Sequence, residues 1–125
     1  MSTINIKGRT GQDDLRDNCW ANLTIKVAGQ TPKKFHKFTG ANGLASNKDF
    51  KLSVEFPGML DPSQIEYFDI EHVSHEQFPQ TRDNWDLDRI EFGMKFGRYP
   101  ITIAQYGSHR FSGSSATLTI YPEEE

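Results

Sequence analysis

The feature that most constrains the fold is an alternation of apolar and polar residues with a period of two. It is clearest where Ala21, Leu23, Ile25 and Val27 alternate with more polar neighbours, the pattern of a strand with one buried face. Turn signals separate such segments at intervals of about 8–12 residues, a spacing typical of an antiparallel sandwich. Seven or eight strands are predicted, over residues 4–6, 19–27, 33–39, 50–56, 65–73, 90–96, 101–105 and 116–120.

Helical periodicity is missing from the sequence. Only Pro62-Ser63-Gln64 predicts a single helical turn, and residues 75–85 and 107–113 are predicted to be loops. The fold class is therefore predicted to be all-β, as an eight-stranded antiparallel β-sandwich. The 125 residues are expected to form one domain over residues 1–125, with a frayed acidic tail at 122–125.

Composition excludes several classes of function. The net charge of −3 argues against a phosphate-backbone partner, so no nucleic acid is expected. The basic cluster at Lys33, Lys34 and Lys37 is interpreted as the lysine-protected edge of a hairpin. The sequence has no run of about 18 apolar residues and no secretory signal, so we expect a protein that is cytoplasmic or exported without a cleaved signal. The single cysteine, Cys19, excludes an intramolecular disulfide.

Two clusters of oxygen-bearing side chains precede predicted strands. Asp13 and Asp14 belong to the upstream cluster, and Asp83, Asn84 and Asp86 belong to the downstream cluster. Calcium takes about six to eight oxygen ligands of these kinds, so a calcium site is predicted if the fold brings both clusters to one end of the sandwich. The spacing is not that of an EF-hand. Aspartate and asparagine also favour tight turns, and ordinary loop chemistry is the alternative interpretation.

Trp85 lies inside the downstream cluster and allows two interpretations. Its ring can project outward to a membrane interface or a sugar, or fold back on the core with its N–H bonded to a carbonyl. The nearby apolar residues Leu87 and Ile90 favour the second. The sequence contains no nucleophile elbow and no glycine-rich phosphate loop, so it predicts no enzyme.

Three stretches of the chain resemble a known family. They are Thr10 to Arg16 (Thr-Gly-Gln-Asp-Asp-Leu-Arg), Asp83 to Asp88 (Asp-Asn-Trp-Asp-Leu-Asp) and Phe111 to Gly113. In order and separation these stretches are similar to the bacterial branch of the PLAT family, the β-sandwiches found in lipoxygenases and clostridial phospholipase toxins. One departure is Asp17-Asn18-Cys19, where relatives usually have glycines.

The resemblance implies an eight-stranded sandwich that binds rather than catalyses, with calcium as the cofactor. Asn84 is implied to offer its backbone carbonyl to the ion. Asp88 matches the motif and is expected to be structural, paired with Arg16 or Arg89. The implied metal ligands are Asp13, Asp14, Asp83, Asn84 and Asp86.

The function implied is that of a non-catalytic binding module, organised by calcium at one end, that contacts lipid headgroups or a protein partner. Arg82 and Trp85 are the residues expected to contact the ligand. One alternative is a carbohydrate-binding module that stacks a glycan on Trp85. Another is a purely structural protein-docking domain whose acidic loops hold turns together. The sequence leaves the oligomeric state open.

Overall fold

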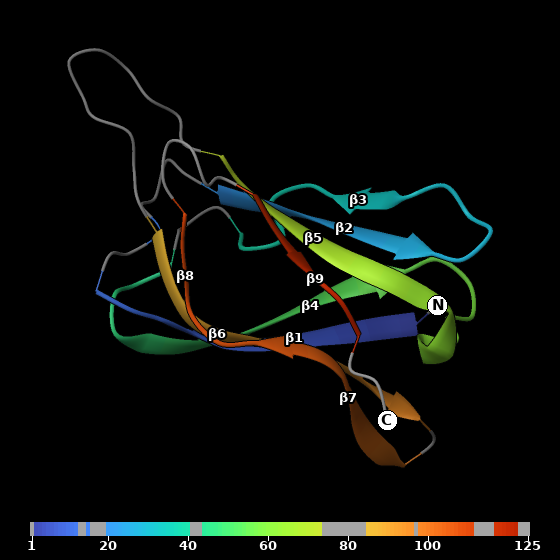
Figure 1. Cartoon of the computed structure of the whole chain (residues 1–125). Helices are drawn as coiled ribbons and strands as arrows, with labels where there is room; N and C mark the ends of the chain where they lie inside the picture. The colour runs from blue at the N-terminus through green and yellow to red at the C-terminus, as the bar shows by residue number, and fades with distance from the viewer. Residues whose placement is uncertain are drawn as a thin grey trace.

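Two antiparallel β-sheets pack face to face in the computed structural model of the protein (Figure 1). The structure describes residues 2–12, 15, 20–40, 44–73, 85–96, 98–111 and 117–122. The first sheet contains β1 (Ser2–Thr10), β4 (Lys48–Phe56), β6 (Trp85–Phe96), β7 (Tyr99–Tyr106) and β8 (His109–Phe111). The second contains β2 (Trp20–Val27), β3 (Lys33–Phe35), β5 (Ile65–Val73) and β9 (Thr117–Ile120), and a short 3-10 helix, η1 (Pro62–Gln64), precedes β5.

The predicted antiparallel sandwich is confirmed, although the number of strands differs. The described residues form sheets of five and four strands rather than eight strands in all. In the first sheet the order is β4-β1-β6-β7, and β8 also pairs with β6. β7 pairs with β6 from Ile90 onward, and β8 pairs with the beginning of β6, from Trp85 to Leu87. The second sheet has the order β3-β2-β5-β9.

The core lies between the two sheets and is built by the predicted alternation. Ile4 and Ile6 of β1 are fully buried, as are Phe68 and Ile70 of β5. Across the sandwich, the ring of Phe68 stacks on that of Phe92 with centroids 4.2 Å apart. Such aromatic contacts let a few large side chains fill the space between twisted sheets.

Two segments form strands that the sequence analysis did not predict, because their polar residues obscure the alternation typical of a strand. β6 begins at Trp85 rather than Ile90, since Trp85 and Leu87 face the core while Asp86 and Asp88 alternate with them. Part of the predicted loop 107–113 is a strand, because His109–Phe111 pairs with Trp85–Leu87.

The hairpin partner of β2 is shorter than predicted. β3 ends at Phe35, and residues 36–39 form turns in which Lys37 has a φ of +53°. The chain still returns to β2 there. The N–H of Phe38 donates to the Ala21 carbonyl at 3.0 Å, and the Thr39 hydroxyl accepts from the Ala21 N–H at 3.1 Å. These bonds provide partners for the backbone N–H and carbonyl of Ala21, which lies beyond the part of β2 that pairs with β3.

The predicted helical turn at Pro62-Ser63-Gln64 is confirmed as η1. Asp61 caps it by accepting a hydrogen bond from the Ser63 N–H, and Pro62 occupies its first turn, where a missing donor costs nothing. None of the helical structure in the described residues is long and apolar enough to cross a bilayer.

Candidate functional site

The end of β1 and the beginning of β6 lie side by side. Thr10 is the register partner of Leu87, and the N–H of Gly11 donates to the carbonyl of Asp86 at 2.8 Å. Gly11 leads directly into the upstream acidic cluster, and Asp86 belongs to the downstream one. The described flanks of the two clusters therefore meet at one end of the sandwich. The predicted ligands Asp13, Asp14, Asp83 and Asn84, and the predicted ligand contact Arg82, lie outside the described residues.

A third segment, which the sequence analysis missed, joins this end. The N–H of Asn47 donates to the Gly11 carbonyl at 2.8 Å. Leu15, only 1% exposed, exchanges two backbone hydrogen bonds with Leu44, at 2.9 and 2.8 Å. Asn47 has a φ of +54°, a left-handed conformation that asparagine tolerates well. The asparagine itself was the sequence signal from which a tight turn could have been predicted here.

Gly11 permits this close approach. A Cβ atom at Gly11 would lie 2.6 Å from Oδ1 of Asp88 and 3.1 Å from Cβ of Asp86. A side chain at Gly11 would require the half-exposed Asp88 carboxylate to turn aside and would press against Asp86. The absence of a side chain at Gly11 therefore lets the end of β1 pack closely against the beginning of β6.

Asp86, a predicted metal ligand, has a basic partner in the structure. Its Oδ1 accepts from Nη1 of Arg110 at 2.7 Å, and its side chain is 22% exposed. Calcium at this carboxylate would share it with, or replace, the guanidinium. Among the residues that the structure describes, no group of three or more histidine, cysteine, aspartate or glutamate side chains is arranged to hold a metal ion.

Asp88 pairs with an arginine, and within the described part of the chain that arginine is Arg9 rather than Arg89. Oδ2 of Asp88 lies 3.7 Å from Nε of Arg9, whereas Arg89 pairs with Asp49 at 3.2 Å. Arg16, the other expected partner, lies outside the described residues. The register decides this outcome, because Arg9 on β1 is opposite the β6 segment that carries Asp88.

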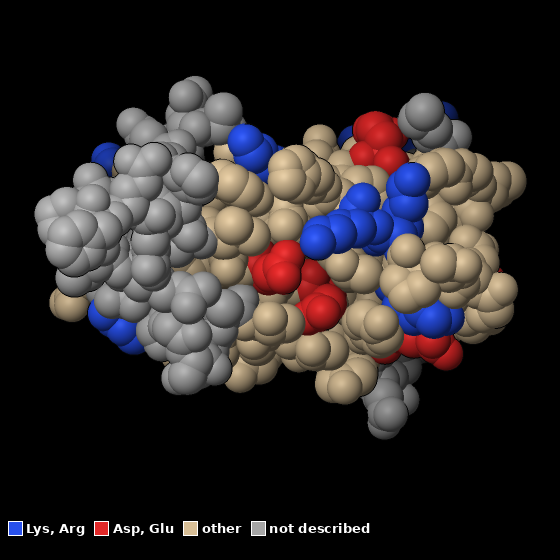
Figure 2. Space-filling model, turned by 90° about the horizontal axis from the view of Figure 1, so that it is seen from above, with Lys and Arg blue, Asp and Glu red and all other residues tan. Residues whose placement is uncertain are grey.

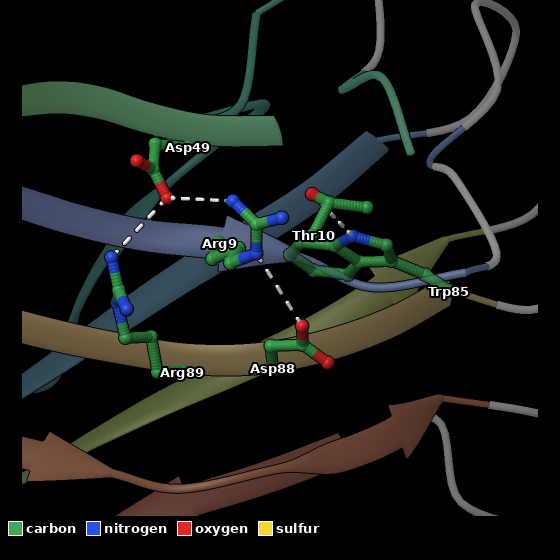
Figure 3. A network of polar contacts seen from close by, with 6 residues as sticks. All are labelled: Arg9, Thr10, Asp49, Trp85, Asp88 and Arg89. Atoms are coloured by element: carbon green, nitrogen blue, oxygen red, sulfur yellow. Dashed lines mark hydrogen bonds and ion pairs between the residues drawn. The ribbon is translucent and has the colours of Figure 1, made fainter. Parts of the chain in front are cut away.

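Figure 3 shows the resulting network on the outer face of the first sheet. Asp49 on β4 accepts hydrogen bonds from Arg9 at 3.3 Å and Arg89 at 3.2 Å, and Arg9 also reaches Asp88 (Figure 3). Charges of alternating sign thus cross β4, β1 and β6. All four side chains are more than a third exposed, so each pair contributes only about 0–1 kcal/mol.

Trp85 requires a correction. Its side chain is fully buried, stacked on Phe111 with ring centroids 5.1 Å apart, so it offers no face to a ligand. Its Nε1 donates to Oγ1 of Thr10 at 3.3 Å, as Figure 3 also shows. The interpretation in which the ring folds back on the core is confirmed, with a hydroxyl in place of the expected carbonyl. A glycan-stacking role for this ring is thereby excluded.

The face of the second sheet is electrically mixed. Figure 2, which views the molecule from the side of that sheet, shows acidic and basic groups close to one another amid uncharged atoms. Lys34 pairs with Glu71 at 3.3 Å, and Nδ2 of Asn22 donates to Glu71 at 3.0 Å. The hydrogen bond from Asn22, then the charge of Lys34, lowers the pKa of Glu71. No single-sign field covers the part of this face that the structure describes.

Comparison with known proteins gives a fold and no close relative. No family model matches the sequence, and no curated protein matches it. A crystal structure of a lipoxygenase variant (Delta413-417:GS LOX) matches with a TM-score of 0.62 and 11% identity over 98% of this chain. The same variant in complex with arachidonate matches with a TM-score of 0.61 and 12% identity over 99% of this chain.

The fold resembles the lipoxygenase PLAT domain. The match spans only 16% and 17% of the two lipoxygenase chains, which is their non-catalytic PLAT domain, a lipid- or protein-binding β-barrel module. At this level of identity the likeness establishes the fold alone. The motifs of the bacterial branch, Thr10 to Arg16 and Asp83 to Asp88, stay predictions.

Proposed function

We propose that the chain is a non-catalytic binding module whose loop end takes up calcium and, through it, anionic lipid headgroups. The loop end consists of Gly11–Gln12, 44–47 and Asp86, with the acidic residues that adjoin them in sequence. The observation that carries the proposal is the 2.8 Å hydrogen bond between the Gly11 N–H and the Asp86 carbonyl. It joins the flanks of the two acidic clusters, which are far apart in the sequence.

Chain connectivity extends this observation to the predicted ligands. Asp13 follows Gly11 by two positions, and Asn84 precedes Asp86 by two. In the proposed site, both residues, close in sequence to the junction of β1 and β6, contribute oxygens to one ion. A set of carboxylate and carbonyl oxygens from two such segments has the chemistry that calcium prefers.

Electrostatics supply the mechanism. A loop end rich in carboxylates repels an anionic membrane until a divalent cation reverses the local charge. Calcium would then both join the two loops and bridge to lipid phosphate. Arg110, which pairs with Asp86, competes with calcium for that carboxylate, and once displaced it would offer a basic group to lipid phosphate at the same end of the sheet.

Thermal unfolding with and without millimolar calcium tests the metal. We expect calcium to raise the melting temperature, because a ligand that binds only the folded state stabilises it. The double variant Asp13→Asn with Asp14→Asn should lose this response. The matched control is Asp69→Asn, on the face of the second sheet, which should keep it. An unchanged melting temperature of the natural protein in calcium would overturn the calcium proposal.

Vesicle sedimentation tests the lipid. Binding to phosphatidylserine vesicles in calcium, and its loss in EDTA or with neutral phosphatidylcholine vesicles, is the expected result. A calcium-dependent rise in melting temperature without any vesicle binding would overturn the lipid assignment and leave a protein partner as the occupant of the loop end.

A further inference from the structure

The outer face of the first sheet carries a groove made of two connected hollows. One has a volume of about 620 Å³ and extends toward Tyr106, and the other has a volume of about 450 Å³ and extends toward Lys95. Both are lined by Lys7, Lys51 and Glu91. We call the two hollows together the lysine groove. Their sizes lie in the range of small-molecule sites, about 300–1,000 Å³.

The second hollow lies beside a β-bulge in β6. The register between β6 and β7 shifts between Phe92 and Gly93, and the ends of these two strands bend away from the sandwich in Figure 1. Gly93 faces outward here, since Phe92 and Met94 on either side of it are buried. A Cβ atom at Gly93 would lie 2.6 Å from the Ile101 carbonyl oxygen, so the close approach of β7 excludes a side chain there. The floor of the hollow therefore stays open.

The lysines of the groove are uncompensated. Lys7 on β1 and Lys51 on β4 are direct register partners, an arrangement in which like charges repel. Among the described residues, neither has a carboxylate within ion-pair distance. Glu91 is the register partner of Lys7 on the other side, but its carboxylate accepts a long hydrogen bond from the Thr102 hydroxyl, at 3.4 Å, and lies beyond ion-pair distance of Lys7.

The neighbouring arginines behave differently. Arg9 and Arg89 on the same face are matched by Asp49 and Asp88 (Figure 3). The second hollow is lined by three lysines and one glutamate, a local excess of two positive charges in a protein whose net charge is −3. Self-repulsion of this kind is relieved when an anion binds.

We infer that the lysine groove binds a phosphomonoester group, independently of calcium. A phosphomonoester carries a charge of about −1.5 to −2 at neutral pH, which matches the local excess, whereas a single carboxylate carries one negative charge. Lysine ammonium groups bind phosphate as mobile point charges. Asn5, a neutral residue whose side-chain amide can donate hydrogen bonds, also lines the second hollow. The phosphate can belong to a soluble ester or to a phosphorylated lipid headgroup.

Amide chemical shifts of isotope-labelled protein, recorded in EDTA, test this inference. Titration with glycerol phosphate should shift the signals of Asn5, Lys7, Lys51 and Gly93, and acetate at equal concentration should shift them much less. Because EDTA removes calcium, this titration gives the same result whether or not the protein binds calcium. The calcium experiments likewise do not depend on phosphate binding in the lysine groove.

Paired variants supply the control. Lys7→Gln with Lys51→Gln should weaken glycerol phosphate binding about tenfold or more, since two of the three lysines that line the second hollow are lost. Lys33→Gln with Lys48→Gln removes the same charge from two exposed lysines outside the groove and should leave the affinity unchanged. The first pair should also unfold at the same temperature as the natural protein or higher, because it relieves a repulsion.

Two results would overturn the inference: no shifts with glycerol phosphate or with phosphatidylinositol phosphate vesicles, or equal losses of affinity in the two variant pairs. The source of the phosphate is decided by comparing the two probes. Binding of glycerol phosphate in solution identifies a soluble ester. Lysine-dependent binding to phosphatidylinositol phosphate vesicles alone identifies a lipid headgroup.

Discussion

Trp85 shows how strongly the surroundings of one residue decide its role. It stands among aspartates in the sequence, yet its ring is fully buried between the sheets. The hydroxyl of Thr10, which is also fully buried, accepts a hydrogen bond from the indole N–H and so provides the buried donor with a partner. A buried donor without a partner is costly, so the two residues act as a unit.

Thr10→Val tests that unit. The change keeps the shape of the side chain and removes the acceptor, so the buried indole N–H loses its partner. We expect the free energy of unfolding to fall by about 1–3 kcal/mol, measured by urea denaturation. Thr10→Ser keeps the hydroxyl and should lose less. Equal stability of Thr10→Val and the natural protein would show that the 3.3 Å contact contributes nothing.

Glu71 gives a pH dependence whose sign follows from its lowered pKa. The folded state, through the Asn22 hydrogen bond and then Lys34, favours the carboxylate, so Glu71 stabilises the fold above its ordinary pKa of 4.5. That contribution is lost as the pH falls through the lowered pKa of the folded state. Because the side chain is about half exposed, the effect should stay below about 1 kcal/mol.

Urea denaturation of Glu71→Gln at several pH values checks this. The variant should be less stable than the natural protein at neutral pH. The difference should shrink progressively once the pH drops below 4.5, where the natural carboxyl becomes protonated. A difference that does not change with pH would show that the charge of Glu71 is not responsible.

At the scale of elements, alternation predicted some strands well and others poorly. β5 begins and ends at the predicted residues, because its core positions carry apolar side chains along its whole length. The first half of β6 was mistaken for a loop, since Asp86 and Asp88 resemble turn residues when their alternation with Trp85 and Leu87 is overlooked. β8 was missed because three residues are too short to show a period, and only its pairing with β6 defines it.

The bulge between β6 and β7 makes Gly93 sensitive to substitution. Gly93→Ala would place a methyl group 2.6 Å from the Ile101 carbonyl oxygen, so the strands must separate. We expect a loss of about 1–3 kcal/mol in urea denaturation. Gly107→Ala is the control, since a Cβ atom there meets nothing within 4 Å, and it should be neutral or slightly stabilising. Similar stabilities of the two variants would contradict the close approach.

At the scale of the whole molecule, the fold class could be predicted from the sequence, but the arrangement of charged residues on the surface could not. Turns and apolar periods were sufficient to predict two antiparallel sheets. The charged network of Figure 3 and the Lys7–Lys51 pair depend on which strands become neighbours. That choice is made by packing across the core, and outward-facing residues carry little information about it.

The central position of β1 has a kinetic consequence. β1 is the first strand in the chain, yet it lies between β4 and β6, and its Asn5 pairs with Gly93, roughly 90 residues later. During synthesis, the β6-facing edge of β1 must wait until most of the protein has been made. Contacts between such distant parts of a chain close slowly, and an open strand edge attracts other chains meanwhile. The pairing of β6 with β1 is thus the step at which folding of this protein competes with aggregation.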